Sequence, residues 1–268
     1  MEEYNAQGLM RVAMTLMVSS LCVKFEAANG SVVQILDDIS FNGRRGEILS
    51  LIGESGCGKT TVLKAIARVV PISSGKAEWL ESGAHHQCVV SYLQYDAPLM
   101  PFRTVLHNAC LGFELAGSEV AKKLEKVADL LIRLRLGDFL NHLPSQISGG
   151  MRQRVAFVQA IGVQPDLLLL DEPFSFQDRV NQAAMEETVF REIKESSIAC
   201  IVVTHDLEAA AAVADDVIIM GAQPGRVSAR LRVPHTMTGV PPNERRSLPA
   251  FDEWADAVWH EVRHARHA

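Results

Sequence analysis

The glycine-rich segment Gly53-Glu54-Ser55-Gly56-Cys57-Gly58-Lys59-Thr60 lies between an apolar run at 48–52 and a helical pattern at 59–69. This spacing turns backbone N–H groups inward around phosphate oxygens, at a helix N-terminus whose dipole favours negative charge. Such a loop requires a buried strand before it and a helix after it. The sequence therefore predicts a strand–loop–helix unit that binds nucleotide phosphates, with Thr61 beside the loop. We expect Lys59 to bridge the β- and γ-phosphates and the Thr60 hydroxyl to bind Mg²⁺, whereas Cys57 is a small residue tolerated in the loop.

Two further apolar runs, at 167–170 and 198–203, are short and end at polar residues, which is typical of buried parallel strands. Helical patterns occupy the intervals, including 180–195. Strands that alternate with helices predict an α/β fold with a parallel central sheet. No strand-like run interrupts 98–160, so we expect an inserted helical subdomain there. Its main helix covers 118–135, with an apolar stripe of Val120, Leu124, Val127, Leu131 and Leu134.

The two ends of the chain carry weaker patterns. The segment 11–23 follows Glu2 and Glu3 and contains polar residues, which favours a first β-strand over a signal peptide. Pro234, Pro241 and Pro242 interrupt the region after 230. A last amphipathic helix is expected to bury Phe251, Trp254, Val258, Trp259 and Val262.

Charged residues follow the two other predicted strands. Asp171 and Glu172 stand at the carboxyl end of 167–170, where ligands collect in open α/β sheets. Asp171 is a candidate Mg²⁺ ligand through water, and Glu172 is a candidate base for an attacking water. The alternative is that the two carboxylates only cap a following helix. His205 follows 198–203; alone it would be a structural residue, but beside the other motifs we expect a γ-phosphate contact.

Bulk properties exclude some classes of function. The net charge is −6 and no basic run is longer than the arginine pairs at 44–45 and 245–246, so nucleic-acid binding is not indicated. The five cysteines are scattered and odd in number, as expected for reduced thiols in a cytosolic protein. No apolar run reaches the roughly 18 residues of a membrane span. A protein of this kind that serves a membrane would dock from its cytosolic side.

The stretch Ile147-Ser148-Gly149-Gly150-Met151-Arg152-Gln153-Arg154 opens a helix shortly before the Asp171-Glu172 strand end. In that setting it resembles the signature motif of ATP-binding-cassette (ABC) ATPases, and residues from about 16 to 230 resemble the nucleotide-binding subunit of an ABC transporter. The resemblance implies a P-loop NTPase (RecA-like) core with a parallel central sheet, an N-terminal antiparallel β edge and an inserted helical subdomain. It also implies ATP and Mg²⁺ as ligands.

The resemblance carries further roles onto individual residues. Gln94 would contact Mg²⁺ or water and sense a membrane partner, and Asp178 would cross a dimer interface. Ser148, Gly149 and Gly150 would bind ATP held by the opposite protomer. Phe25 would stack on adenine, although an aromatic residue on a strand is more often part of the core.

The segment Gln94-Tyr95-Asp96 and residues 98–108 resemble the importer ATPases for nitrate, sulfonates and taurine, as do Met151 and Pro224-Gly225-Arg226. This resemblance implies a peripheral protein on the cytoplasmic face of the membrane, with two permease subunits, an extracytoplasmic solute-binding protein and a second ATPase subunit. A homodimer is favoured over a heterodimer. By the same resemblance, 1–93 and 162–230 form the ATP-binding core, 94–161 the helical subdomain, and 231–268 a C-terminal tail with a helix.

Three alternative functions remain open. A non-transport ABC ATPase usually joins two cassettes or carries long coiled-coil insertions, and a P-loop kinase or GTPase lacks the signature motif. A degenerate cassette that scarcely hydrolyses ATP is opposed by Glu172 and His205. Phe176 and Gln177 depart from the family pattern near Asp178 and are hypothesised to alter communication across the dimer. His260, His264 and His267 share a helical face, so a metal site is conceivable, although such a tail is more often solvated.

Overall fold

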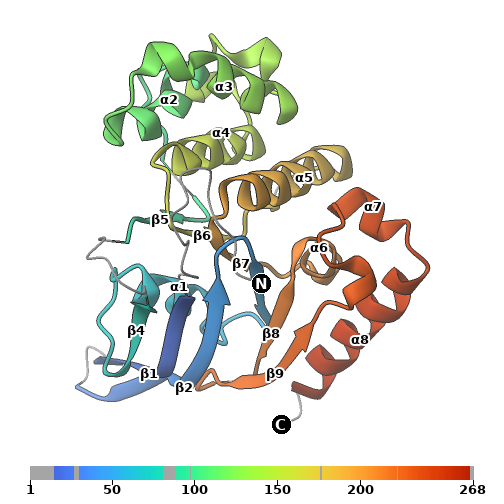
Figure 1. Ribbon diagram of the computed structural model, residues 1–268. Coiled ribbons are helices and arrows are strands. Elements are labelled where there is room, and N and C mark those ends of the chain that lie inside the picture. Colours follow the sequence, from blue (N-terminus) through green and yellow to red (C-terminus); the bar gives the residue numbers. More distant parts are fainter. Residues whose placement is uncertain are drawn as a thin grey trace, which may run out of the picture.

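The computed structural model describes residues 15–26, 30–80, 88–96, 98–175, 177–221 and 223–265. A six-stranded sheet forms the centre of the molecule (Figure 1). Its first five strands are parallel and only the last pairing is antiparallel. In spatial order the strands are β5 (Val90–Leu93), β6 (Leu167–Asp171), β7 (Ala199–Val203), β3 (Ile48–Gly53), β8 (Asp216–Met220) and β9 (Val227–Arg232).

The predicted strands at 48–52, 167–170 and 198–203 are confirmed as β3, β6 and β7. Every residue of β6 and β7 is buried, which explains why these strands read as continuous apolar runs rather than alternating ones. Successive side chains point to opposite faces of the sheet. Leu168 and Leu170 therefore belong to one core cluster, and Leu167 and Leu169 to another on the opposite face.

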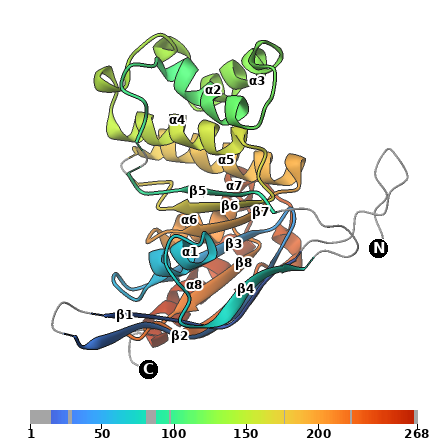
Figure 2. The same cartoon turned by 90° about the vertical axis from the view of Figure 1, so that its left-hand side faces the viewer.

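A second, antiparallel sheet lies against one face of the central sheet (Figure 2). It has the order β2 (Val32–Arg44), β1 (Thr15–Glu26) and β4 (Ser74–Leu80). Helix α1 (Lys59–Ile66) lies between the two sheets and shares their core. The predicted first strand at 11–23 is observed from Thr15 onward, and its residues 11–14 lie outside the described residues.

Helices cover the opposite face of the central sheet in two layers, which both views show (Figures 1 and 2). Helix α5 (Arg179–Ser196) packs on the sheet through Met185, Val189 and Ile193. Beyond it lies a group of helices and two 3-10 turns: α2 (Val105–Leu115), α3 (Val120–Arg133), η1 (Gly137–Phe139), η2 (Pro144–Gln146) and α4 (Gly149–Gly162).

The predicted helix at 118–135 corresponds to α3, and Val127, Leu131 and Leu134 are buried as expected. Leu124 is instead 40% exposed, because the buried face of α3 is narrower than the apolar stripe in the sequence.

The chain after residue 203 contains more regular secondary structure than its prolines indicate. Helix α6 (Leu207–Val213) is followed, after β8 and β9, by η3 (His235–Met237), α7 (Pro242–Arg246) and α8 (Ala250–Ala265). Helix α7 was not predicted; Pro242 occupies its first turn, where a missing N–H costs no hydrogen bond. In α8 the buried face carries Phe251, Trp254, Val258 and Val262. Trp259, expected in that face, is half exposed beneath the Arg263 guanidinium.

Among the described residues, no helix combines the length and the apolar character needed to cross a membrane.

Two glycines allow α2 and α4 to approach closely. A Cβ atom on Gly112 would lie 1.9 Å from the carbonyl oxygen of Gln159, and one on Gly162 would lie 2.8 Å from Phe113. The backbones of the two helices therefore meet where neither residue has a side chain. This contact holds α2 against the helix that begins with the Ser-Gly-Gly turn.

We predict that Gly112→Ala lowers the free energy of unfolding by about 1–3 kcal/mol, because the new methyl group must push α2 from α4. Urea unfolding followed by circular dichroism measures the change. Gly43→Ala is the matched control, since a Cβ atom there meets nothing within 4 Å. Equal stability of the two variants would contradict the close approach of α2 and α4.

Candidate functional site

The phosphate loop connects β3 to α1 as predicted. Gly58 is the N-cap of α1 and has φ +99°, a conformation that glycine adopts readily and other residues rarely do. A Cβ atom on Gly58 would also lie 2.6 Å from the Leu36 side chain. The loop receives further support from Gln223, whose Nε2 donates to the Gly56 carbonyl oxygen at 3.0 Å.

Lys59 points back into the curve of this loop. Its Nζ donates to the carbonyl oxygens of Gly53 and Glu54, both at 2.8 Å, and the residue is only 8% exposed. Two backbone acceptors thus hold the ammonium on carbonyl oxygens of the loop, which it would have to leave to contact an anion there. Cys57 is buried, and burial raises the pKa of its thiol, so it acts in packing rather than as a nucleophile.

Asp171 lies at the end of β6 and contacts the phosphate loop directly. The Thr60 hydroxyl donates to Asp171 Oδ1 at 3.0 Å, and the Tyr92 hydroxyl donates to Oδ2 at 3.2 Å. Burial raises the pKa of the Asp171 carboxyl, while the two hydrogen bonds favour its ionised form and act against this shift. The three residues form a cluster of oxygen ligands at the edge of the loop.

Glu172, the next residue, adopts a left-handed backbone conformation with φ +53°. Non-glycine residues rarely do so, and strained positions of this kind cluster at functional sites. Its Oε2 lies 2.7 Å from His205 Nδ1 and accepts a hydrogen bond from Ser175 Oγ at 3.2 Å. The His205 side chain is 69% exposed, so the pair faces solvent at the open edge of the site.

A hollow of ≈ 420 Å³ lies between the phosphate loop and Glu172, and its volume is within the size range of small-ligand sites. Phe25 is 40% exposed at its rim and is therefore not a core residue. The residues that line the hollow are Phe25, Ile35, Ser55, Gly56, Gly58, Lys59, Thr60, Thr61, Glu172 and Val203.

The remaining candidates lie elsewhere. Ser148 is the N-cap of α4, where its Oγ accepts from the Met151 backbone N–H at 3.3 Å. Ser148 and Gly149 are exposed and Gly150 is buried. None of the three lines the hollow beside Lys59, as far as the described residues extend.

Asp178 is the N-cap of α5. Its Oδ1 accepts from the backbone N–H groups of Val180 and Asn181 at 3.1 and 3.0 Å, and Asn181 Nδ2 donates to Oδ2. These hydrogen bonds lower the pKa of Asp178. The largest effect comes from the Asn181 backbone N–H, and smaller ones come from the Asn181 side chain and the Val180 backbone. The Asp178 side chain is exposed.

A buried arginine links this aspartate to the Ser-Gly-Gly turn. Arg154 Nε donates to the Gly150 carbonyl oxygen at 3.3 Å, and its NH1 donates to Asn181 Oδ1 at 3.0 Å. Since Asn181 also donates to Asp178, the N-termini of α4 and α5 are connected within one chain.

Gln94 follows β5 and is exposed at a groove between the sheet and the helical group. Its backbone oxygen accepts a long hydrogen bond from Gln153 Nε2, at 3.5 Å. The groove is lined by 91–94, Pro98, Gly112, Leu115, Ala156, Gln159, Ala160 and Val163.

Two of the predictions, the altered loop at 176–177 and the C-terminal histidines, involve residues that the structure describes only in part. Phe176 lies outside the described residues, and Gln177 donates to the Pro173 carbonyl oxygen at 3.1 Å. The Nε2 atoms of His260 and His264 lie 3.0 Å apart, and His267 lies outside the described residues.

The structure adds residues that sequence reasoning missed. Tyr92 reaches Asp171 because β5 pairs in parallel with β6, with Tyr92 opposite Leu169. No local pattern indicates that 90–93 lies beside 167–170. Ser175 could have been suspected from its place three residues after Glu172, but Arg154 reads as an ordinary residue of an amphipathic helix.

A phosphate loop and two carboxylates at the carboxyl edge of a parallel sheet define a P-loop nucleotide-binding protein. The family model described as "ABC transporter" matches residues 36–175. The chain is 34% identical to the uncharacterized ABC transporter ATP-binding protein YtlC of Bacillus subtilis, over 84% of this chain and 87% of that protein. It is 33% identical to the taurine import ATP-binding protein TauB of Rhizobium johnstonii, over 94% of this chain and 97% of that protein.

Solved structures agree on the fold. The ATP-binding subunit of an ABC transporter superposes with a TM-score of 0.69 at 25% identity, over 92% of this chain and 99% of that one. A dimeric post-hydrolysis state of the cassette MJ0796 bound to ADP and Pi gives a TM-score of 0.71 at 21% identity, over 82% of this chain and 99% of that one. The chain therefore belongs to the ABC transporter family, as an ABC-type ATPase.

We predict that Tyr92→Phe lowers the free energy of unfolding by about 1–2 kcal/mol, because the buried Asp171 carboxylate loses a donor. Urea unfolding in the wild type and in Asp171→Asn gives the coupling between the two residues. A loss of equal size in both backgrounds would show that the hydroxyl does not act through Asp171.

Proposed function

We propose that this protein is the ATP-hydrolysing subunit of an importer for a small anionic or zwitterionic sulfonate of the taurine class. The observation that carries the proposal is the arrangement of Lys59 in the phosphate loop, of Thr60 hydrogen-bonded to Asp171, and of the adjacent Glu172 in contact with His205. It joins a phosphate loop to a carboxylate with a histidine partner at one hollow. The similarity to taurine import ATP-binding proteins supports the solute class.

ATP would occupy the hollow with its phosphates in the loop 53–61 and its adenine against the exposed ring of Phe25. Lys59 would meet the β- and γ-phosphates once its ammonium leaves the two carbonyl oxygens that it now contacts. The exposed ring of Phe25 presents a flat apolar face suited to stacking on a base.

Glu172 is proposed as the base for the attacking water, and His205 as the residue that orients this carboxylate and contacts the γ-phosphate. The 2.7 Å contact between them fixes one carboxylate oxygen and leaves the other for water. A positioned base of this kind contributes roughly 10²–10⁴-fold in rate.

The oxygen atoms of Thr60, Asp171 and Gln94 fit Mg²⁺, which prefers hard oxygen ligands and retains several waters. The hydrogen bond between Thr60 and Asp171 keeps two of these ligands together. Bound there, Mg²⁺ would neutralise phosphate charge.

A second copy of the chain is proposed to complete each site. Ser148 and Gly149 are exposed at a helix N-terminus that suits an anion, yet they do not line the hollow of their own chain among the described residues. Ser148, Gly149 and Gly150 would therefore bind the γ-phosphate held by the partner, with Asp178 crossing the interface. ATP between the two subunits would close them, and hydrolysis would release them.

The groove beside Gln94 is proposed to receive one of two permease subunits. Phe102, which lies shortly before α2, and Leu115, the last residue of α2, are 76% and 72% exposed, which is unusual for side chains of this size. Leu115 lines the groove itself. An extracytoplasmic binding protein would deliver the solute, and the ATPase would lie on the cytoplasmic face of the membrane.

In this proposal 1–93 and 162–230 bind and hydrolyse ATP, and 94–161 carries the permease groove and the signature residues. In the C-terminal part, 231–268, the described residues, which end at Ala265, pack on the ATP-binding core.

We expect Glu172→Gln to lower the ATPase rate by about 10²–10⁴-fold while ATP binding persists, because only the base is lost. Phosphate release measures the rate.

A pull-down of the variant from detergent-solubilised membranes with Mg-ATP, read by mass spectrometry, tests the partners. Recovery of a polytopic permease supports the importer; recovery of soluble proteins alone, or an unchanged rate, overturns it. Glu253→Gln, at an exposed position of α8, is the control.

A mixing experiment tests the shared site. Lys59→Ala and Ser148→Arg should each abolish ATPase activity, because each removes one half of both composite sites. Hybrid dimers of the two variants contain one intact site, so the mixture should regain activity. Failure of the mixture to exceed either variant alone would rule out a site shared between subunits.

A further inference from the structure

Two adjacent arginines at the end of α7 contact both ends of α6, the helix that begins directly after His205. Arg246 reaches the first turn of α6, where its Nε lies 3.1 Å from Glu208 Oε1. Arg245 reaches the other end, where its NH1 donates to the Ala214 carbonyl oxygen at 2.6 Å. Helix α6 is thus held from outside at its start and at its end.

Helix α6 needs such support because its own side chains are small. Its sequence is Leu-Glu-Ala-Ala-Ala-Ala-Val, and residues 209–213 are buried. Each alanine side chain buries little apolar area, so apolar packing contributes little per residue to holding the helix in place. Trp254 of α8 adds one directional contact, from its Nε1 to the Ala211 carbonyl oxygen at 3.0 Å.

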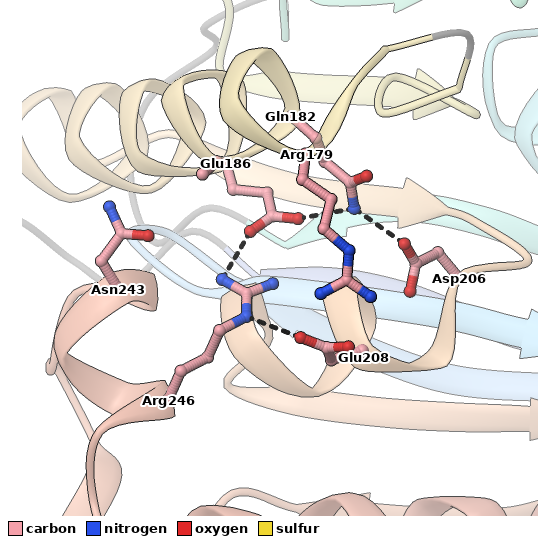
Figure 3. Close-up of a pocket in the computed structure, with 8 residues that line it drawn as sticks. Arg179, Gln182, Glu186, Asp206, Glu208, Asn243 and Arg246 are labelled. Carbon is pink, nitrogen blue, oxygen red and sulfur yellow. Dashed lines mark hydrogen bonds and ion pairs between the residues drawn. The ribbon is translucent and has the colours of Figure 1, made fainter.

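Arg246 also connects α6 to α5, as Figure 3 shows. Its NH1 lies 2.7 Å from Glu186 Oε2, and the Glu186 side chain is only 1% exposed. A carboxylate buried to this degree needs a charged partner. Because one guanidinium contacts both Glu186 and Glu208, it links the two helices.

A second contact links α5 and α6 in the pocket that Figure 3 shows, which Glu186 and Arg246 also line. Gln182 Nε2 donates to Glu186 Oε1 at 3.0 Å and to Asp206 Oδ2 at 2.7 Å. Asp206 is the N-cap of α6 and is the residue directly after His205. The contacts therefore run from α5, whose N-cap is Asp178, to the residue next to the histidine that contacts Glu172.

We propose that Arg246 is a positioning residue for ATP hydrolysis: by bridging Glu186 and Glu208 it fixes α6 against α5 and so aligns His205 with Glu172. This inference rests on the proposed function, in which His205 and Glu172 act on ATP. The C-terminal part of the chain thereby supports the ATP site without touching ATP.

The test uses the full chain with Arg246→Ala, and with Glu208→Gln as a milder variant. Glu208 is exposed, so this second change breaks one bridge without leaving a buried charge unpaired. Each variant should lower kcat about 3- to 10-fold and leave KM for ATP within about twofold, as expected for a residue that acts through alignment. Arg246→Lys should restore part of kcat, because one ammonium can contact either carboxylate but cannot fork between both.

The second measurement is independent of activity. The imidazole ¹H–¹³C resonance of His205, assigned by its loss in His205→Ala, should shift in Arg246→Ala and Glu208→Gln. It should not shift in Arg263→Ala, a control arginine on α8 whose guanidinium covers Trp259. Unchanged His205 resonances in both test variants overturn the inference, as does a fall in melting temperature with kcat preserved.

The two proposals fail in different ways. If His205→Ala keeps the wild-type kcat, the assignment of His205 to hydrolysis is wrong and the inference falls with it. If His205→Ala lowers kcat but Arg246→Ala lowers it by the same factor with and without His205, only the inference is wrong, because additive effects exclude action through the histidine.

Discussion

Parallel pairing of β6, β7 and β3 is the constraint on which the rest of the site depends. Val203 pairs with Leu51 on one side and with Asp171 on the other, so β6 and β7 end at the same level and β3 continues to Gly53. The phosphate loop, the two carboxylates and His205 follow these ends. A hydrogen bond such as that from Thr60 to Asp171, across more than a hundred residues of sequence, exists only because this register holds. A one-residue slip would turn every side chain to the other face.

Local chemistry explains what could be predicted. The phosphate loop, the buried strands and the carboxylates are each encoded in a few contiguous residues, so their nature is readable before the fold is known. Tyr92 could not be found this way, because it reaches Asp171 only through the pairing of β5 with β6. Helix α7 is too short to show a periodic pattern. The apolar stripes of α3 and α8 were predicted, but periodicity does not tell how much of a stripe is covered, and Leu124 and Trp259 remain exposed.

The helical group is tied to the ATP-binding core by polar contacts as well as by packing. Arg154 is almost fully buried, and desolvation lowers its pKa, yet it remains the donor that joins Gly150 to Asn181. Replacing a buried charge by apolar groups is often neutral for stability, so stability alone gives no reason for an arginine here. A directional contact, by contrast, fixes the N-termini of α4 and α5 relative to one another. In the proposed dimer both termini face the partner, and their fixed spacing would let one ATP engage both.

The same reasoning applies to Arg246, with a different consequence. Burial raises the pKa of Glu186, and the guanidinium acts against this shift, so the carboxylate depends on its partner to stay ionised. An apolar pair at this place would hold α5 and α6 together but would let them slide, because apolar contacts have no preferred direction. Sliding by about one ångström would lengthen both contacts between His205 and Glu172 Oε2, which are that of the ring Nδ1 at 2.7 Å and that of the backbone N–H at 3.4 Å. The ion pair therefore fixes the relative position of the two helices rather than adding much to the free energy of unfolding. A hydrogen-bonded catalytic pair requires such fixed positions of the helices around it.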